Sequence, residues 1–258
     1  YYTDPYCRTF DASVCRAFEH EGRPAVTLDR TAFYPSSGGQ PFDTGRLGAA
    51  GVVETVDAGR DVIHVLSAAL AVGVAVTGEI DWARRFDHMQ QHTGQHVLSA
   101  AFDRLFDNRT VGFHMGAEVS TIDLAREPAS AEVERAVDDA NGIVWEDRPV
   151  SIRFVSQADA ANLTLRKQSA REGALRLIDI SGFDLSACGG THVERTGAVG
   201  VIAALSRERL RRGSRVAFVC GGRALRALRT YRDAVAGSVR ALSVLPGELP
   251  AAVERVQA

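Results

Sequence analysis

The chain has 258 residues, 45% of them apolar, and a formal net charge of −2. This is enough for a packed core and for two domains, and no apolar stretch reaches the ~18 residues of a membrane span. The first residues lack the basic and apolar regions of a signal peptide, and four scattered cysteines are too few for a disulfide scaffold. We therefore expect a cytoplasmic protein with reduced thiols, in which Cys7, Cys15 and Cys220 are small buried or half-buried side chains.

The first 80 residues contain short β-branched segments separated by Gly, Asp and Pro clusters, which is typical of an all-β domain. These segments are residues 24–34, 45–56, 60–67 and 74–81. They predict a small amino-terminal β-barrel domain over residues 1–80. Inside it, the loop YPSSGGQPFDTG (34–45) contains Gly38 and Gly39, which allow positive φ and close approach by another chain. A plain hairpin loop and a loop that faces a substrate explain these glycines equally well.

The pattern changes near Asp81, and residues 81–222 predict an α+β domain with a mainly antiparallel sheet. A helix is expected from Asp81 to about Phe106, because apolar residues recur at helical intervals and the single Gly94 does not stop it. Ser130 is a candidate cap for a second helix. A further helix is expected near 157–171, and strands are expected at 111–124, 174–180, 198–205 and 214–220. A helix from Arg223 to about Ser243 and another from Glu248 predict a helical extension over 223–258.

Two pairs of metal-binding side chains are the most informative feature of the sequence. His92 and His96 lie four residues apart in HTGQH, and Cys188 and His192 lie four apart in CGGTH. Histidines at i and i+4 share one helical face, and a thiolate with three imidazoles suits zinc. His88 adds an alternative, because one ion cannot take both His88 and His96, which lie ~12 Å apart along a helix. Spacing alone leaves the pairs 88/92 and 92/96 open.

Positive charge is concentrated late in the chain. Residues 201–240 hold ten arginines against Glu208 and Asp233. Clustered arginines can bind the phosphates of a nucleic acid, and they can equally form a solvated basic face, since Arg outnumbers Lys 29 to 1 in this chain. The candidates for RNA contact are Arg207, Arg209, Arg211, Arg212 and Arg215.

Several motifs together resemble one known family. HTGQH at 92–96, CGGTH at 188–192, IDISGFDLSA before the latter and the loop YPSSGGQPFDTG are similar to alanyl-tRNA editing proteins of the AlaX type. They also resemble the editing domain of alanyl-tRNA synthetase. The last 40 residues look like the longer AlaX form with its carboxy-terminal domain missing, and the chain starts without Met. We therefore expect a trimmed or shortened relative, or a fragment of the synthetase.

The resemblance implies a hydrolase that acts in trans on mischarged tRNA(Ala), chiefly Ser-tRNA(Ala), with Gly-tRNA(Ala) as a further candidate. It implies Zn²⁺ held by His92, His96, Cys188 and His192. It also implies that Gly38, Gly39 and Gln40 face the tRNA acceptor end or the bound aminoacyl group. A non-catalytic tRNA-binding module with structural zinc is the alternative. DNA and membranes are not expected partners, and the sequence leaves the oligomeric state open.

Two questions about chemistry follow from these residues. Four protein ligands fill the usual shell of zinc, so the ion either exchanges a ligand or mainly orients the site. In the second case Gln95, Thr191 or the ribose hydroxyl of the substrate would position the water. Size cannot exclude alanine from a pocket that admits serine, but a pocket that hydrogen-bonds the serine hydroxyl can reject alanine. Thr93, Gln95, Ser120 and Thr121 are the candidates for that bond. If glycine is also a substrate, recognition of the hydroxyl is not the whole explanation.

Overall fold

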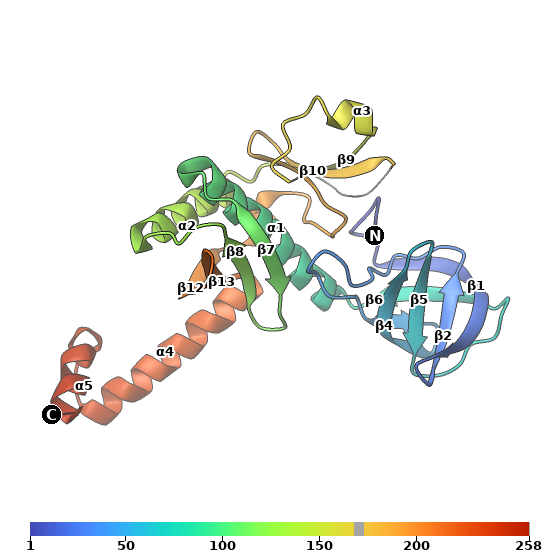
Figure 1. The fold of residues 1–258 in the computed structure, drawn as a ribbon. Coiled ribbons are helices and arrows are strands. Elements are labelled where there is room, and N and C mark those ends of the chain that lie inside the picture. The colour runs from blue at the N-terminus through green and yellow to red at the C-terminus, as the bar shows by residue number, and fades with distance from the viewer. Residues whose placement is uncertain (168–172, 258) are drawn as a thin grey trace.

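The computed structural model describes residues 1–167 and 173–257, and it has the expected α+β class (Figure 1). Residues 9–80 form a closed barrel in the strand order β1-β2-β5-β4-β3-β6, with every neighbouring pair antiparallel. The strands are β1 (Thr9–His20), β2 (Arg23–Leu28), β3 (Gly45–Leu47), β4 (Ala50–Ala58), β5 (Asp61–Leu66) and β6 (Ala75–Ile80). The predicted barrel is therefore confirmed, although β1 was not among the predicted segments.

The barrel encloses its own apolar core. Phe10, Phe33 and Leu47 are among its buried residues, and side chains along β1 alternate between this core and solvent. Cys15 lies on the outer face of β1 and is exposed. The expectation of a half-buried Cys15 was therefore wrong, because a strand of a closed barrel directs every second side chain outward.

Helix α1 (Trp82–Phe106) follows the barrel directly and forms the centre of the molecule. The Asp81 side chain caps its first turn by accepting a hydrogen bond from the Arg84 backbone N–H. Gly94 is needed for packing, because a Cβ added there would lie 2.3 Å from Cys220 Sγ. Cys220 itself is fully buried, as expected.

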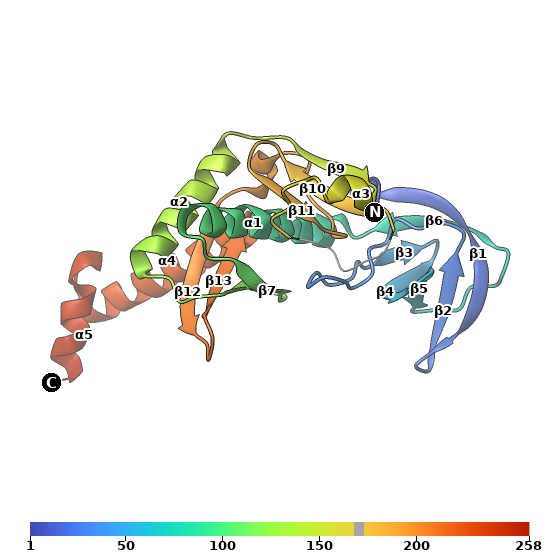
Figure 2. The ribbon, with the colours of Figure 1, turned by 45° about the horizontal axis from the view of Figure 1, so that its top comes forward.

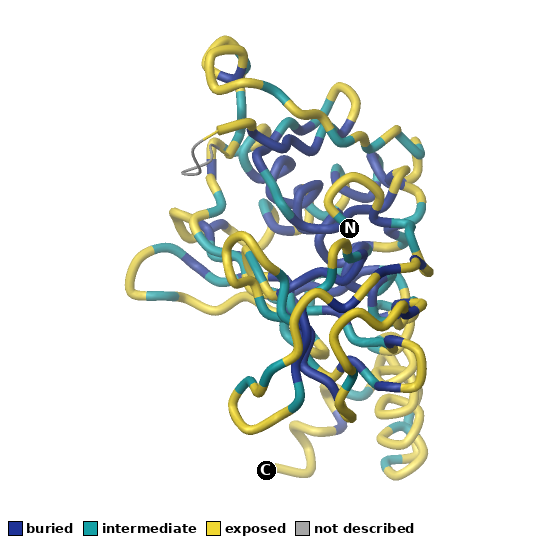
Figure 3. Tube along the Cα trace, turned by 90° about the vertical axis from the view of Figure 1, so that its right-hand side faces the viewer, coloured by how far each residue is buried: buried dark blue, intermediate teal, exposed yellow. Residues whose placement is uncertain are grey.

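Two antiparallel sheets pack near α1, where the sequence predicted one (Figures 1 and 2). One sheet has the order β11-β10-β9, from β9 (Val150–Val155), β10 (Leu175–Ile180) and β11 (Asp184–Ala187). The other has the order β12-β13-β8-β7, from β7 (Thr110–Met115), β8 (Ser120–Leu124), β12 (Ile202–Arg209) and β13 (Ser214–Cys220). The main core joins the four-stranded sheet to α1, α2 (Ser130–Trp145) and the short 3-10 helix η1 (Thr196–Val199), and Ile180 of β10 belongs to it. The three-stranded sheet also has a separate apolar cluster that includes Leu175 and Leu177. Buried segments are concentrated in this middle part, and the carboxy-terminal end is exposed (Figure 3).

Two local predictions were wrong. The expected helix at 157–171 is only α3 (Gln157–Ala160); residues 161–167 are not helical, and 168–171 lie outside the described residues. Ser130 is the first residue of α2, while Ala129 occupies the cap position and donates its N–H to Glu132 Oε2 at 2.7 Å. The Glu132 carboxylate thus satisfies the helix start that a serine hydroxyl was expected to satisfy.

The carboxy-terminal extension consists of α4 (Gly222–Leu242), the 3-10 helix η2 (Pro246–Glu248) and α5 (Leu249–Gln257). Helix α4 projects away from the rest of the molecule, and α5 folds back beside its end (Figure 1). Among the described helices, none is long and apolar enough to cross a membrane.

A buried ion pair joins the loop 34–45 to α1. The guanidinium of Arg85 binds the Asp43 carboxylate, with Nε 3.1 Å from Oδ1, and both side chains are completely buried. Arg85 also donates to the backbone carbonyls of Pro5 and Ala32 at 2.7 and 2.6 Å. Asp43 in turn accepts the Tyr34 N–H at 2.6 Å. One guanidinium therefore holds three separate segments against the start of the central helix.

We expect Asp43→Asn to lower the free energy of unfolding by about 3–5 kcal/mol, because it leaves the buried Arg85 charge without its partner. Urea denaturation followed by circular dichroism measures this loss. Asp61→Asn is the matched control, since the Arg16–Asp61 pair has side chains 67% and 53% exposed and should contribute little. Equal free energies of unfolding for the two variants would contradict the stabilising role assigned to the Arg85–Asp43 pair.

Candidate metal centre and its cavity

Four side chains from two distant segments converge beside α1. His92 and His96 project from the helix, and Cys188 and His192 come from the loop that follows β11. In the described part of the chain, one potential ligand atom from each residue lies within 4.8 Å of the other three. Cys188 Sγ lies 3.4 Å from Nε2 of both His92 and His192. Tetrahedral zinc, with bonds of ~2.0–2.3 Å, would place such atoms about 3.5 Å apart. The cluster could therefore hold a metal ion.

The second ring nitrogen of each imidazole has a partner elsewhere in the chain. His92 Nδ1 lies 2.7 Å from Gln40 Oε1, and His96 Nδ1 lies 3.0 Å from Asp184 Oδ2. These oxygens are acceptors, so both Nδ1 atoms carry hydrogen and both Nε2 lone pairs are free for a metal. His192 Nδ1 lies 3.1 Å from Thr93 Oγ1. Such outer partners are the usual support of metal-binding histidines, and the donor set therefore fits a zinc ion.

The electrostatics of the cluster also suit a cation. Burial alone would disfavour a thiolate, but His92 and His192 beside the sulfur lower the pKa of Cys188 well below its usual value. Burial lowers the pKa of His92 and of His192, which favours the neutral imidazoles that metals bind. Asp184 is buried, yet hydrogen bonds from His96 and Arg166 lower its pKa and keep its carboxylate charged.

His88 lies outside this cluster. It is buried, its Nδ1 has no hydrogen-bond partner in the described structure, and it lines a different cavity with Arg84, Asp87 and Arg223. Burial lowers the pKa of His88 to about 3. The structure therefore brings the 92/96 pair, and not 88/92, to Cys188 and His192.

The second glycine of the CGG segment is required by packing. A Cβ at position 190 would lie 2.1 Å from His92 Cε1 and 2.9 Å from Gln40 Oε1. At position 189 a Cβ would meet nothing within 4 Å. Gly190 therefore lets the Cys188–His192 loop pass directly over the His92 ring.

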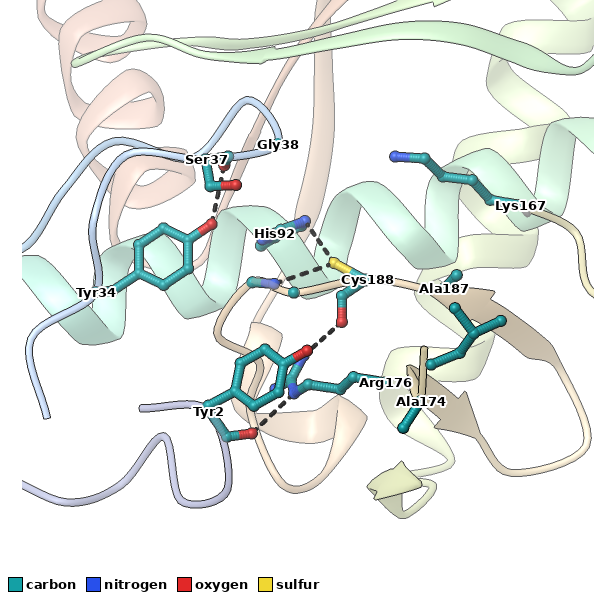
Figure 4. Close-up of a pocket in the computed structure, with 13 residues that line it drawn as sticks. Tyr2, Tyr34, Ser37, Gly38, His92, Lys167, Ala174, Arg176, Ala187 and Cys188 are labelled. Atoms are coloured by element: carbon teal, nitrogen blue, oxygen red, sulfur yellow. Dashed lines mark hydrogen bonds between the residues drawn. The ribbon is translucent and has the colours of Figure 1, made fainter. Parts of the chain in front are cut away.

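A cavity of about 330 Å³ opens onto one side of the cluster (Figure 4). Its described lining includes His92 and Cys188 but neither His96 nor His192, so a ligand would approach the metal centre from the sulfur side. The remaining lining residues come from the segment around Cys188 and from four other segments. They are Tyr2, Tyr34, Ser37, Gly38, Lys167, Ala174, Leu175, Arg176, Ala187, Gly189 and Gly190.

The glycine loop forms part of this cavity through a tight turn. Ser37 and Gln40 exchange backbone hydrogen bonds of 3.1 and 2.9 Å, and Gly38 and Gly39 between them have φ of +57° and +88°. Two positive φ angles define a turn that strongly favours glycine. A Cβ at Gly39 would lie 2.7 Å from the Phe113 carbonyl oxygen, so this turn also packs tightly on β7. The loop is therefore both a hairpin turn and a wall of the cavity.

Gln40 and Thr191 connect the two halves of the site. Gln40 Nε2 donates to Thr191 Oγ1 at 2.9 Å, and Gln40 Oε1 accepts the Thr191 N–H at 3.1 Å as well as the His92 Nδ1–H. Both residues are buried, and neither is among the described residues that line the cavity. Their contacts support an orienting role for the His92 ring.

The other polar candidates are not among the described residues that line this cavity, although Gln95 lines a second cavity of about 140 Å³. Thr93 Oγ1 accepts the Val193 N–H at 3.1 Å and contacts His192, and Gln95 Nε2 donates to Ser99 Oγ at 2.8 Å. Ser120 and Thr121 lie on β8, and the described lining of the His92 cavity includes none of these four residues. Sequence reasoning missed the cavity residues Tyr34, Ser37 and Arg176, although the first two flank the glycine pair in the sequence.

The predicted arginine cluster lies on the hairpin of β12 and β13. Arg215 binds Asp123 through hydrogen bonds of 2.7 and 2.9 Å, and Arg207 donates to the Pro128 carbonyl. Arg209 lies 3.4 Å from Glu127, while Arg211 and Arg212 are exposed at the turn. The two turn arginines are therefore the members of the cluster most available for an external anion.

Comparisons with known proteins connect this geometry to a family. Residues 175–217 match the family model described as "Threonyl and Alanyl tRNA synthetase second additional domain". Over 99% of its length, the chain is 33% identical to the alanyl-tRNA editing protein AlaX-L of Pyrococcus horikoshii. The chain is a relative of the alanyl-tRNA editing proteins. The resemblance inferred from the motifs is thereby confirmed.

Two other relatives match most of this chain. It is 33% identical over 99% of its length to the alanine–tRNA ligase of Pyrococcus furiosus, and 33% identical over 86% of its length to the alanyl-tRNA editing protein Aarsd1 of Danio rerio. The chain spans 65% of AlaX-L, 58% of Aarsd1 and 29% of the ligase.

We expect Gly190→Ala to weaken zinc binding by at least about tenfold, because the added methyl group displaces the His92 ring from its position. Equilibrium dialysis with zinc, followed by metal analysis, measures the change. Gly189→Ala is the matched control and should bind zinc like the unaltered chain. Equal affinity of both variants would show that the position of the His92 ring does not depend on the lack of a side chain at position 190.

Proposed function

We propose that this chain is a zinc-dependent hydrolase that deacylates mischarged tRNA(Ala), chiefly Ser-tRNA(Ala), with Gly-tRNA(Ala) as a second substrate. The metal ligands in this proposal are His92, His96, Cys188 and His192. The observation that carries it is the exposure of the Cys188–His92 edge of this cluster to a cavity beside the glycine loop. The relatives are alanyl-tRNA editing proteins and alanine–tRNA ligases, and their names supply the substrate class.

The role of zinc in this proposal follows from the position of the cavity. When bound, zinc would act as a Lewis acid toward the ester carbonyl or a water molecule. The chain contributes a fixed site for the ester: Gln40 and Asp184 orient His92 and His96, and the glycine turn bounds the cavity. Arg176 stiffens the opposite wall by donating to the carbonyls of Cys188 and Tyr2 at 2.6 and 2.8 Å.

Selectivity for serine requires a polar group in the cavity itself, because alanine is smaller than serine and cannot be excluded by size. The four residues suggested by the sequence do not line the cavity, whereas Ser37 does. The Tyr34 hydroxyl donates to the Ser37 carbonyl at 2.9 Å and fixes the backbone at this point. Ser37 therefore replaces Thr93, Gln95, Ser120 and Thr121 as the candidate that binds the serine hydroxyl.

A tRNA-binding module with structural zinc is the second candidate, favoured by one observation. Four protein ligands complete a tetrahedral shell, which is the usual arrangement of a structural site. Under this alternative the cavity would bind the acceptor end without hydrolysing the ester. The hydrolase would cleave the ester, whereas the binding module would leave it intact.

We expect the zinc-loaded protein to hydrolyse Ser-tRNA(Ala) faster than Ala-tRNA(Ala), and Cys188→Ala to lose this activity because a ligand at the open edge is gone. Release of radiolabelled amino acid from Ser-, Gly- and Ala-tRNA(Ala) measures the three rates. Cys15→Ala is the control, since Cys15 is exposed on the barrel. Folded, zinc-loaded protein that releases serine no faster than the spontaneous rate would support the structural-zinc module instead.

A further inference from the structure

Lysine occurs once in this chain, at position 167, among 29 arginines. A lysine ammonium is a compact charge on a flexible stem, and a guanidinium is a wide planar fork, so the two are not interchangeable at a confined site. The single lysine lies in the lining of the cavity next to the metal centre, and its side chain extends over α1 on the side of His92 (Figure 4). This coincidence of rarity and position marks Lys167 as a candidate binding residue.

The backbone at Lys167 is tied to the segment that carries the metal ligand Cys188. The Ala187 N–H donates to the Lys167 carbonyl at 3.0 Å, and the Arg166 N–H donates to the Leu185 carbonyl at 3.0 Å. Residues 166 and 167 therefore run parallel to β11, with a bridge between Lys167 and Ser186. This pairing holds the lysine at a fixed distance from Cys188.

Lys167 also lines a second, smaller cavity of about 140 Å³. Its other described lining residues include Arg109, Thr110 and Arg166. Asp103 contributes a carboxylate to the same lining. The charge of Arg166 is taken up by Asp184, with contacts of 2.6 and 3.0 Å. Within the described residues, neither Lys167 nor Arg109 has an ion-pair partner. Lys167 lines both cavities and Arg109 lines the second, so two positive charges are available to a ligand that reaches the second cavity.

The chemistry of an aminoacyl-tRNA end matches this arrangement. The nearest fixed negative charge to the esterified hydroxyl is the phosphate on the 5′ side of the terminal ribose. Lysine binds phosphate as a point charge, and arginine binds it with a fork of N–H donors. A terminal nucleotide in the first cavity would direct that phosphate toward the second cavity, where both cations lie.

We propose that Lys167 and Arg109 form a phosphate-binding subsite for the phosphodiester next to the terminal nucleotide of the tRNA, and that Lys167 thereby positions the ester at the Cys188–His92 edge. The identification of the ligand as tRNA rests on the proposed function, but the binding of phosphate does not. Lys167 is thus a positioning residue, and the ester itself is bound and hydrolysed elsewhere in the cavity.

Matched esters with and without the phosphate test the subsite. The seryl ester of adenosine, the seryl ester of adenosine 5′-monophosphate and Ser-tRNA(Ala) would be compared as substrates of the zinc-loaded chain. We expect Lys167→Gln to lower kcat/KM by about ten- to a hundredfold for the two substrates with phosphate, mainly through KM. The phosphate-free ester should be hydrolysed as before, and Lys167→Arg, which keeps the charge, should recover part of the loss.

Arg60→Gln is the control, because it removes one positive charge, as Lys167→Gln does. Arg60 is exposed on the turn between β4 and β5. Calorimetric titration with adenosine 5′-monophosphate and with adenosine gives a second readout that requires no hydrolysis. The subsite is supported if adenosine 5′-monophosphate binds more tightly than adenosine, and if this difference is lost in Lys167→Gln and kept in Arg60→Gln. This result would support the subsite even if no ester is cleaved. In that case only the proposed hydrolase activity would fail. An equal effect of Lys167→Gln on ligands with and without phosphate would overturn the proposed phosphate-binding subsite.

Discussion

The buried pair of Arg85 and Asp43 is the interaction on which the arrangement of the site depends. Asp43 belongs to the loop 34–45 of the barrel, and Arg85 belongs to the first turns of the helix that presents His92 and His96. A buried charge without a partner is strongly unfavourable, so the loop has one acceptable position on the helix. That position places Gln40 beside His92 and the glycine turn at the cavity. The barrel and the metal centre are therefore parts of one structure, although they lie in separate stretches of the sequence.

The three imidazoles are oriented by three different parts of the chain. Gln40 from the barrel loop holds His92, Asp184 from β11 holds His96, and Thr93 from α1 itself holds His192. Because each ring is fixed through Nδ1, each Nε2 is directed inward before any ion arrives. A preorganised set of donors avoids the entropic cost of ordering long side chains on binding. Among the described residues, the cavity beside the glycine turn reaches the cluster at His92 and Cys188, and a separate cavity reaches it at His192.

Much of the fold and the ligand set could be predicted because the signals are local. The HTGQH and CGGTH patterns indicate a metal site by residue type and spacing, and the family resemblance singled out the 92/96 pair over 88/92. Short β-branched segments between turn clusters indicated the barrel. The partners of those ligands could not be predicted, since Gln40 and His92 lie 52 residues apart and meet only through tertiary packing. Local composition was misleading near 157–171, where helix-forming residues give way to an extended pairing of Lys167 with β11. Strand β1 was missed because the prediction relied on β-branched segments, and β1 contains only two β-branched residues, Thr9 and Val14.

The wide separation of the ligands along the chain has a consequence for biosynthesis. Cys188 and His92 lie 96 residues apart, so a growing chain presents the two helical histidines long before the remaining ligands leave the ribosome. A complete coordination shell then exists only after β11 and the loop that follows it have docked on α1. Capture of an ion at that moment would add its binding free energy to the folding of the central region. Occupancy of the centre would thus report that the late segments have reached their places, and a chain that misfolds there would be left without metal.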